Sequence, residues 1–160
     1  MVVSGDFKIR GRWACIGNLT YPDLEDPASS LQEKGFTREQ ASSHCWFFDS
    51  QGLLTKERIC IPEHKRPFTH DDASIENFAE AIYALKPTAI IGCAGQVGVF
   101  SEELVKAMAE LNERPIIFAL SNPTAKAECS AEEAYRWSDG RAIFASGSTR
   151  VPRSLSPPAY

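Results

Sequence analysis

Short apolar runs alternate with helix-forming patterns along most of this chain, and that alternation constrains the fold more than any other feature. Four runs have the length of a strand and are followed by turn residues: residues 45–48, 88–92, 115–120 and 142–145. Because these runs are apolar almost throughout, they predict strands that are covered on both faces, as in a parallel sheet. The sequence therefore predicts an α/β fold.

Helix signals separate the four runs. Thr37 and Ser130 each open a capping box, and Ser101 precedes two glutamates that suit the positive end of a helix. Apolar residues at helical spacing predict a further helix between Ser74 and Lys86: Ile75, Phe78, Ile82 and Leu85. One helix is thus expected before the first strand and one between each successive pair.

The remaining segments show little periodicity. Residues 1–30 contain a polar, turn-rich stretch, so we expect an irregular lead-in there. Residues 53–73 carry two prolines and scattered cations, and we expect mostly loop. Residues 149–160 hold three prolines and are expected to form an irregular tail. The domain itself is expected to span residues 31–148.

Composition excludes some classes of function. The net charge is −4, which gives no reason to expect binding to nucleic acid or to an anionic membrane. No apolar run approaches the roughly 18 residues that a membrane span needs. The five cysteines are scattered and odd in number, which argues against a disulfide framework. We expect an intracellular location, cytoplasmic or mitochondrial, with an organellar transit peptide left open.

The carboxyl ends of the predicted strands indicate where a ligand would bind, because open parallel sheets bind ligands at that edge. Those ends are Asp49, residues 93–98, residues 121–124 and residues 146–148.

Asp49 directly follows a buried run, where a carboxylate can accept hydrogen bonds from the adenosine ribose of a dinucleotide. The alternative is a turn aspartate that ends the strand. Ser50 and Lys65 would favour a cofactor with a 2′-phosphate if they lie nearby. On spacing alone, however, an exposed loop cation is the favoured interpretation of Lys65.

Two further turns carry candidate residues. Gly95 and Gly98 would let a ligand approach the backbone closely, although they do not form a G-x-G-x-x-G motif. Asn122 offers amide donors and an acceptor that suit a hydroxy acid or a carboxamide. It could equally hydrogen-bond its own turn.

Other chemistry finds little support. Cys60, His64 and His70 are spaced like loose zinc ligands but lack a fourth ligand, so no metal site is predicted. No G-x-S-x-G nucleophile motif is present, and no catalytic residue is assigned. Lys126 and Glu128 could pair across their loop, but we expect both to be solvated.

Five segments resemble the malic enzymes, and together they cover about residues 31–148: residues 48–53 (FDSQGL), 86–92 (KPTAIIG), 112–124 (NERPIIFALSNPT), 126–129 (KAEC) and 140–148 (GRAIFASGS). The resemblance implies a parallel Rossmann-like sheet with helices on both faces. It also implies a family that oxidises malate with NAD or NADP and decarboxylates the product to pyruvate with Mg²⁺ or Mn²⁺.

The resemblance assigns roles to single residues. Asp49 would contact the adenosine ribose, and Cys93, Ala94 and Gly95 would lie along the cofactor. Asn122 would contact malate near the nicotinamide. Ser50 and Lys65 look like the pair that accompanies NADP in the family, which favours NADP over NAD.

Several segments of the malic enzymes have no counterpart in this sequence. The phosphate loop, the catalytic Tyr and Lys and the acidic metal ligands have no counterpart in residues 1–30, and the Gly-Asn-Asn segment expected after Ser148 is missing. We therefore expect an incomplete fold that lacks its first βαβ unit and leaves an open edge near the middle of the sheet. Both ends are expected to be those of a fragment, a splice product or a degenerate copy.

Several interpretations follow from these departures. The chain is expected to be the NAD(P)-binding portion of a malic enzyme, inactive alone and associating as a homo-oligomer or with a malic enzyme subunit. Alternatively, the rest of an active enzyme lies outside this sequence, or the chain is a non-enzymatic module or remnant that pairs with full-length malic enzyme through its open edge. A small zinc module is a further alternative.

Overall fold

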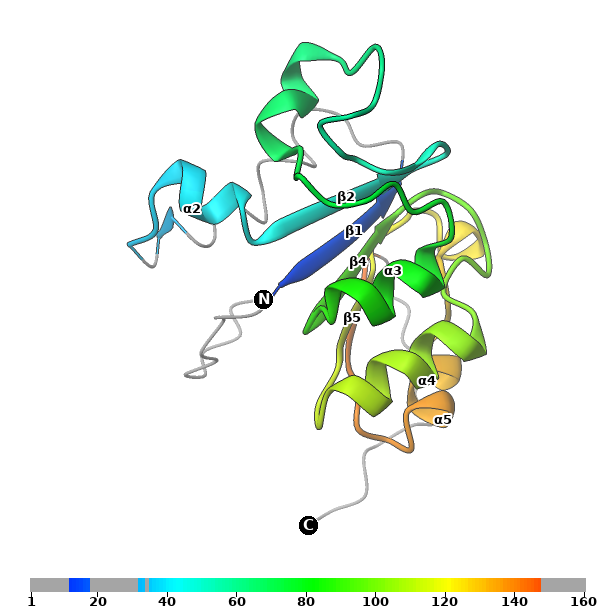
Figure 1. Cartoon of the computed structure of the whole chain (residues 1–160). Coiled ribbons are helices and arrows are strands. Elements are labelled where there is room, and N and C mark those ends of the chain that lie inside the picture. Colours follow the sequence, from blue (N-terminus) through cyan, green and yellow to red (C-terminus); the bar gives the residue numbers. More distant parts are fainter. Residues whose placement is uncertain (1–11, 18–31, 34, 148–160) are drawn as a thin grey trace.

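The computed structural model describes residues 12–17, 32–33 and 35–147, and these form a six-stranded sheet with helices packed on it (Figure 1). The strands are β1 (Trp13–Gly17), β2 (Cys45–Asp49), β3 (Gly52–Leu53), β4 (Ala89–Cys93), β5 (Ile116–Ala119) and β6 (Ile143–Ser146). Their order is β3-β2-β1-β4-β5-β6, and only β3 is antiparallel to its neighbour. The predicted α/β fold is confirmed, and this order is typical of Rossmann sheets.

The helices begin close to the predicted caps. They are α2 (Arg38–Ser42), η1 (Glu63–Phe68), α3 (Phe78–Leu85), α4 (Glu102–Leu111), η2 (Thr124–Lys126) and α5 (Ala131–Trp137). Both capping boxes form, at Thr37 and Ser130. The helix expected from Ser74 begins later, after the N-cap Asn77. The carbonyl of Ile75 instead accepts a hydrogen bond from the Leu53 amide, which holds this segment against β3.

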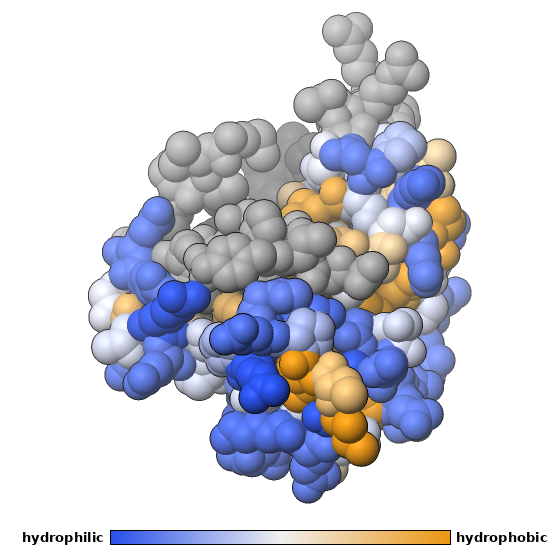
Figure 2. All heavy atoms as spheres, turned by 90° about the horizontal axis from the view of Figure 1, so that it is seen from above, coloured by the Kyte–Doolittle hydropathy of each residue, from blue (hydrophilic) through white to orange (hydrophobic). Residues whose placement is uncertain are grey.

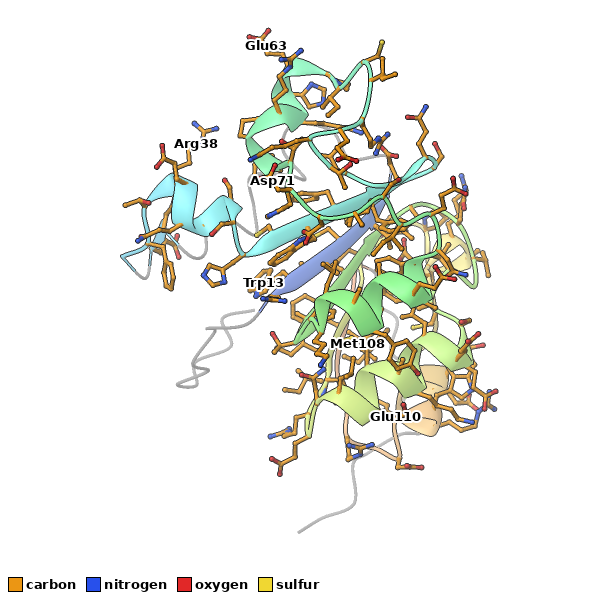
Figure 3. The ribbon with its side chains drawn as sticks, viewed as in Figure 1. Trp13, Arg38, Glu63, Asp71, Met108 and Glu110 are labelled. Carbon is orange, nitrogen blue, oxygen red and sulfur yellow. The ribbon has the colours of Figure 1, made fainter. Side chains whose placement is uncertain are left out.

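Alternate side chains of the strands point to opposite faces, and each face has its own apolar cluster. On one face, α3, α4 and α5 cover Ala14, Phe48, Ile90 and Ile117 (Figure 1). Met108, labelled in Figure 3, is one of the fully buried residues of α4 on this side, with Val105 and Ala107. On the other face, residues of α2 and η1 pack with side chains of β1, β2 and β4.

β1 corrects two expectations. Residues 1–30 were expected to be irregular, but Trp13–Gly17 form a strand that pairs with both β2 and β4. The expected open edge in the middle of the sheet is therefore absent. The run Trp13-Ala14-Cys15-Ile16, bounded by Arg12 and Gly17, is a strand signal that the polar stretch after it obscured. Residues 18–31, between β1 and α2, lie outside the described residues.

The stretch expected to be loop, residues 53–73, also contains structure. Leu53 belongs to β3, and η1 buries Lys65 and Phe68. The ring of Phe68 meets Phe47 of β2 edge to face, with ring centroids 5.0 Å apart. The predicted tail lies outside the described residues. No helix among the described residues is long and apolar enough to cross a membrane.

Candidate functional site

The carboxyl ends of the five parallel strands share one edge of the sheet, and the sequence predicts this for four of them. The chain runs from β1 outward to β2 and then crosses to β4 on the other side of β1. The strand order therefore reverses between β1 and β4, and ligands of open α/β sheets bind in the crevice at such a reversal. Asp49 lies at the end of β2 and Cys93 at the end of β4, and β1 is the strand between them. At the usual spacing of strands, these two ends lie roughly 10 Å apart.

Asp49 is held by two cations and its own turn. Its carboxylate oxygens lie 3.1 Å from Arg58 Nη1 and 3.2 Å from Lys65 Nζ, and Oδ1 accepts a hydrogen bond from the Gln51 amide at 3.0 Å. Arg58 also donates to the Gln51 side chain at 2.7 Å. Lys65 is buried, and its ammonium group faces Asp49 and not solvent. Ser50 is exposed in the turn.

These contacts keep Asp49 ionised. Burial raises the pKa of Asp49, but hydrogen bonds from the Gln51 amide and Arg58, the charge of Arg58 and a hydrogen bond from Lys65 lower it further, so the net pKa lies below the usual value. A carboxylate in this state accepts hydrogen bonds only. The geometry thus supplies a fixed acceptor at the end of β2.

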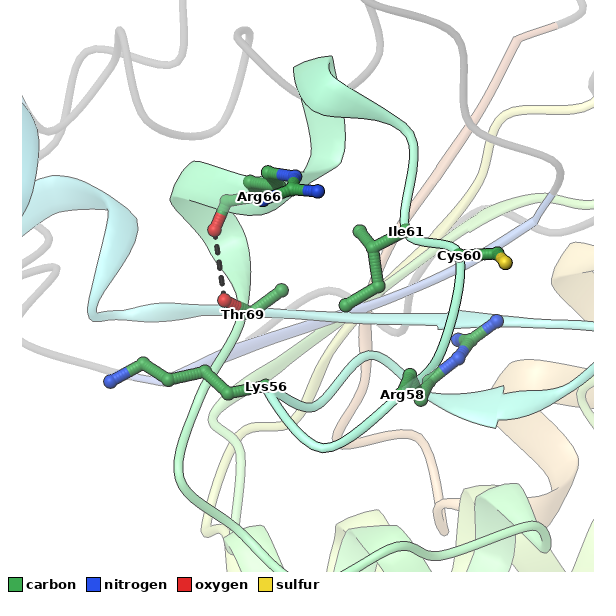
Figure 4. A pocket seen from close by; sticks show the side chains of 6 residues that line it. All are labelled: Lys56, Arg58, Cys60, Ile61, Arg66 and Thr69. Atoms are coloured by element: carbon green, nitrogen blue, oxygen red, sulfur yellow. Dashed lines mark hydrogen bonds between the residues drawn. The ribbon is translucent and has the colours of Figure 1, made fainter.

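A cavity of about 270 Å³ lies next to this cluster (Figure 4). Its lining residues come from the loop after β3 and from η1 and its end: Lys56, Arg58, Cys60, Ile61, Arg66 and Thr69. Arg58 both lines the cavity and pairs with Asp49. Two of the three cations that line the cavity also pair with carboxylates, Arg58 with Asp49 and Lys56 with Asp71. The guanidinium groups of Arg58 and Arg66 suit an anion such as a phosphate group.

The turn after β4 leaves its backbone accessible. Gly95 and Gly98 have φ values of 63° and 77°, and no atom lies within 4 Å of where a Cβ would stand. This left-handed backbone favours glycine, and the open space is where a ligand could approach. Cys93 and Ala94 are half-buried at the start of the turn, and Val97 is exposed at its tip.

The loop after β5 lies against this turn. The Gly95 amide donates to Ser121 Oγ at 2.8 Å, and the Ala94 amide donates to Glu128 Oε1 at 2.8 Å. Asn122, the next residue after Ser121, is exposed. The structure thus forms two groups from the predicted residues: Asp49, Ser50 and Lys65 at the end of β2, and Cys93, Ala94, Gly95 and Asn122 at the ends of β4 and β5.

Similarity to known proteins agrees with this arrangement. The family model described as "Malic enzyme, NAD binding domain" matches residues 25–156. The chain belongs to the malic enzyme family. It is 48% identical over 126 residues to the NADP-dependent malic enzymes of Rattus norvegicus and Homo sapiens, which covers 79% of this chain and 22% of each relative. A chloroplastic NADP-dependent malic enzyme of Solanum lycopersicum is 46% identical over 130 residues, 81% of this chain and 23% of the relative.

This chain spans less than a quarter of the length of these malic enzymes. The family match begins before residue 31 and ends after residue 148, so it is wider than the resemblance found in the sequence. The family and its NAD-binding domain are thereby established for this chain.

Two contributors to the site were missed. Arg58 stands in an irregular loop nine residues after Asp49, and no local pattern indicates that it turns back onto the carboxylate. Glu128, expected in solvent, is fully buried, while Lys126 is exposed as expected. The only local signal for burial of Glu128 was its position between two small, buried residues, Ala127 and Cys129.

The loose zinc pattern is not brought together. His70 stacks on Trp46 with ring centroids 4.5 Å apart, and its Nε2 lies 2.9 Å from the Cys45 carbonyl. Within residues 12–17, 32–33 and 35–147, no group of three His, Cys, Asp or Glu side chains could hold a metal ion. The described residues therefore do not fit the divalent metal that the family resemblance implies.

Proposed function

We propose that this chain is the cofactor-binding part of a malic enzyme and that it prefers NADP over NAD. The observation that carries the preference is the cation-lined cavity beside Asp49. In a Rossmann sheet, the carboxylate after the second strand faces the adenosine ribose. A phosphate on the 2′ oxygen of that ribose would then lie where Arg58 and the cavity can receive it.

The residues at the end of β2 divide this task. Asp49 is a fixed acceptor for a ribose hydroxyl, and the cations that now neutralise it are positioned to share a phosphate bound beside it. Arg66 adds a further charge on the far wall of the cavity (Figure 4). Charge-assisted hydrogen bonds of this kind are about twice as strong as neutral ones.

The ends of β4 and β5 would hold the other half of the cofactor and the substrate. NADP, when bound, supplies the acceptor for a hydride from malate. The open backbone of the Cys93–Gly98 turn would lie along the cofactor, and the exposed amide of Asn122 would orient malate.

The face drawn in Figure 2 is mostly hydrophilic and carries only small, separate hydrophobic patches.

Turnover of malate requires more than cofactor binding. The described residues offer no metal-ligand group, so decarboxylation and proton transfer would need residues from other parts of a full-length enzyme. We therefore propose that this chain alone binds the cofactor and does not turn over malate. An assay of NADPH formation with malate and Mg²⁺ checks this, and turnover at an ordinary malic enzyme rate would refute it.

The alternative of a non-enzymatic interaction module loses its main support. It depended on an open edge in the middle of the sheet, and β1 occupies that position. No other described feature favours it.

The test of the cofactor proposal is a comparison of NADP with NAD. At about 100 times its dissociation constant, a ligand stabilises a protein by roughly 2.7 kcal/mol, which would raise the midpoint of thermal unfolding by about 5–10 °C. We expect this shift with NADP at a concentration where NAD gives less. Replacing Arg66 by Gln removes one exposed cavity cation, and we expect NADP binding to weaken about fivefold with NAD unchanged.

Lys106→Gln is the matched control, because Lys106 is an exposed cation on α4 away from the cavity. Equal affinity of the wild-type chain for NADP and NAD would refute the preference. Absence of binding to either cofactor would refute the proposed function itself.

A further inference from the structure

Glu128 is a fully buried carboxylate at the proposed site, and none of the roles above uses it. Among the described residues, no ion pair joins it to a cation. Burying a charge without a cation is costly unless hydrogen bonds satisfy its oxygens. The hydrogen-bond partners of Glu128 therefore indicate which part of the structure its burial holds in place.

Within the described part of the chain, the side-chain partners of Glu128 belong to the two loops of the site. Oε1 accepts from the Ala94 amide at 2.8 Å and from the hydroxyl of Ser121, and Oε2 accepts from the Ser121 amide at 3.4 Å. The Ser121 hydroxyl in turn accepts from the Gly95 amide at 2.8 Å. A chain of hydrogen bonds thus runs from the turn after β4, through Ser121, to Glu128 and back to that turn.

Gly92 makes this arrangement sterically feasible. A Cβ on Gly92 would stand 2.5 Å from both Cγ and Cδ of Glu128, so a side chain on β4 would displace the carboxylate. The backbone carbonyl of Glu128 accepts from the Phe100 amide at 3.2 Å, just before α4. The residue is therefore fixed from three sides, by β4, by the loop after β5 and by the segment that leads into α4.

We propose that Glu128 is a positioning residue that joins the cofactor-binding turn to the substrate-binding loop. This inference rests on the proposed function. Ala94 and Gly95 would lie along the cofactor, and Asn122 directly follows Ser121, so one carboxylate sets the spacing between the two binding elements. Because it acts at neither the ribose nor the 2′-phosphate, its loss weakens NADP and NAD binding by the same factor.

Glu128→Gln tests this in the full 160-residue chain. Glutamine keeps the shape but replaces one acceptor oxygen with a donor group, so at least one of the three donors loses its acceptor. Hydrogen exchange of the unliganded protein, followed by NMR, should show amides of Ala94, Gly95 or Ser121 exchanging at least tenfold faster. The dissociation constants of NADP and NAD should both rise about tenfold, with their ratio unchanged.

Glu132→Gln is the control, with the same change of charge four residues away on the exposed side of α5. We expect it to change neither exchange nor affinity. If Glu128→Gln fails to fold, Ser121→Ala removes the middle of the hydrogen-bond chain and should accelerate exchange of the Gly95 amide and weaken both cofactors.

The outcomes separate the inference from the proposed function. Unchanged exchange at the three amides, or faster exchange with unaltered affinity for a cofactor that the wild type binds, overturns the positioning role. A change in the ratio of NADP to NAD affinity also overturns it. If the wild type binds neither cofactor, the proposed function fails, and the exchange data still decide whether Glu128 joins the two loops.

Discussion

Asp49→Asn should destabilise the chain even without a cofactor, because it removes the shared anion of two cations. The side chains of Asp49, Arg58 and Lys65 are only 16%, 16% and 11% exposed, so none of them is well solvated. Asparagine keeps one oxygen and turns the other position into a donor that faces cations. Removing one partner from a buried pair costs about 3–5 kcal/mol. Because this cluster keeps some exposure, we expect about 2–3 kcal/mol.

The cost should depend on pH in a defined direction. The pKa of Asp49 is lowered in the folded state, so its contribution is fully present above the unfolded value of about 3.9 and is lost as the pH falls through the lower folded pKa. The difference in free energy of unfolding between wild type and Asp49→Asn should therefore be constant above about pH 4 and shrink below it.

Urea unfolding at pH 7 and at pH 3 measures this, with Asp71→Asn as the matched control. Asp71 also pairs with a lysine, Lys56, at 2.6 Å, but the two side chains are 79% and 55% exposed. An exposed pair contributes about 0–1 kcal/mol, so the control should lose little. Equal losses in both variants, or a loss at Asp49 that does not shrink with acid, would show that the cluster is not a buried charge network.

Three further predictions concern the core and the site. Gly92→Ala should destabilise by about 1–3 kcal/mol in urea unfolding, because its Cβ meets a buried carboxylate at 2.5 Å, and a loss near zero would contradict this. At pH 8, a thiol reagent should label the exposed Cys60 before Cys45 and Cys129, because burial raises the pKa values of those two thiols to about 12. Cys60 also lines the cavity, so mass spectrometry should show that NADP slows its labelling more than NAD does. Ser130→Ala removes the cap of α5 and should cost about 1 kcal/mol, with an unchanged midpoint as the contrary result.

The strands and helix starts were predictable from the sequence where the signal is local. β2, β4, β5 and β6 are continuous apolar runs, and the capping boxes at Thr37 and Ser130 need only residues three positions apart. β1 is the opposite case. Its four apolar residues are typical of a strand but too few to stand out beside the polar stretch that follows, and its central place depends on pairing with strands 32 and 76 residues later.

The place of the candidate site residues in the fold was predictable, but the partners of their charged side chains were not. That a carboxylate, a glycine turn and an amide would meet at one edge follows from parallel strands, which end on the same side. That Lys65 turns inward depends on η1, whose Phe68 packs on Phe47, and this is a tertiary contact without a local pattern.

Glu128 shows most directly why the rest could not be predicted. In the sequence it is one more charged residue in a loop, and charged residues are rarely fully buried unless paired. Its burial is compensated by donors 34 and 7 residues away, on two different loops, and by the missing side chain at Gly92. Each of these features is unremarkable alone, and only the fold makes them neighbours. The structure therefore reveals a buried acceptor shared by the amides of two loops of the proposed site, which the pattern of residues alone does not show.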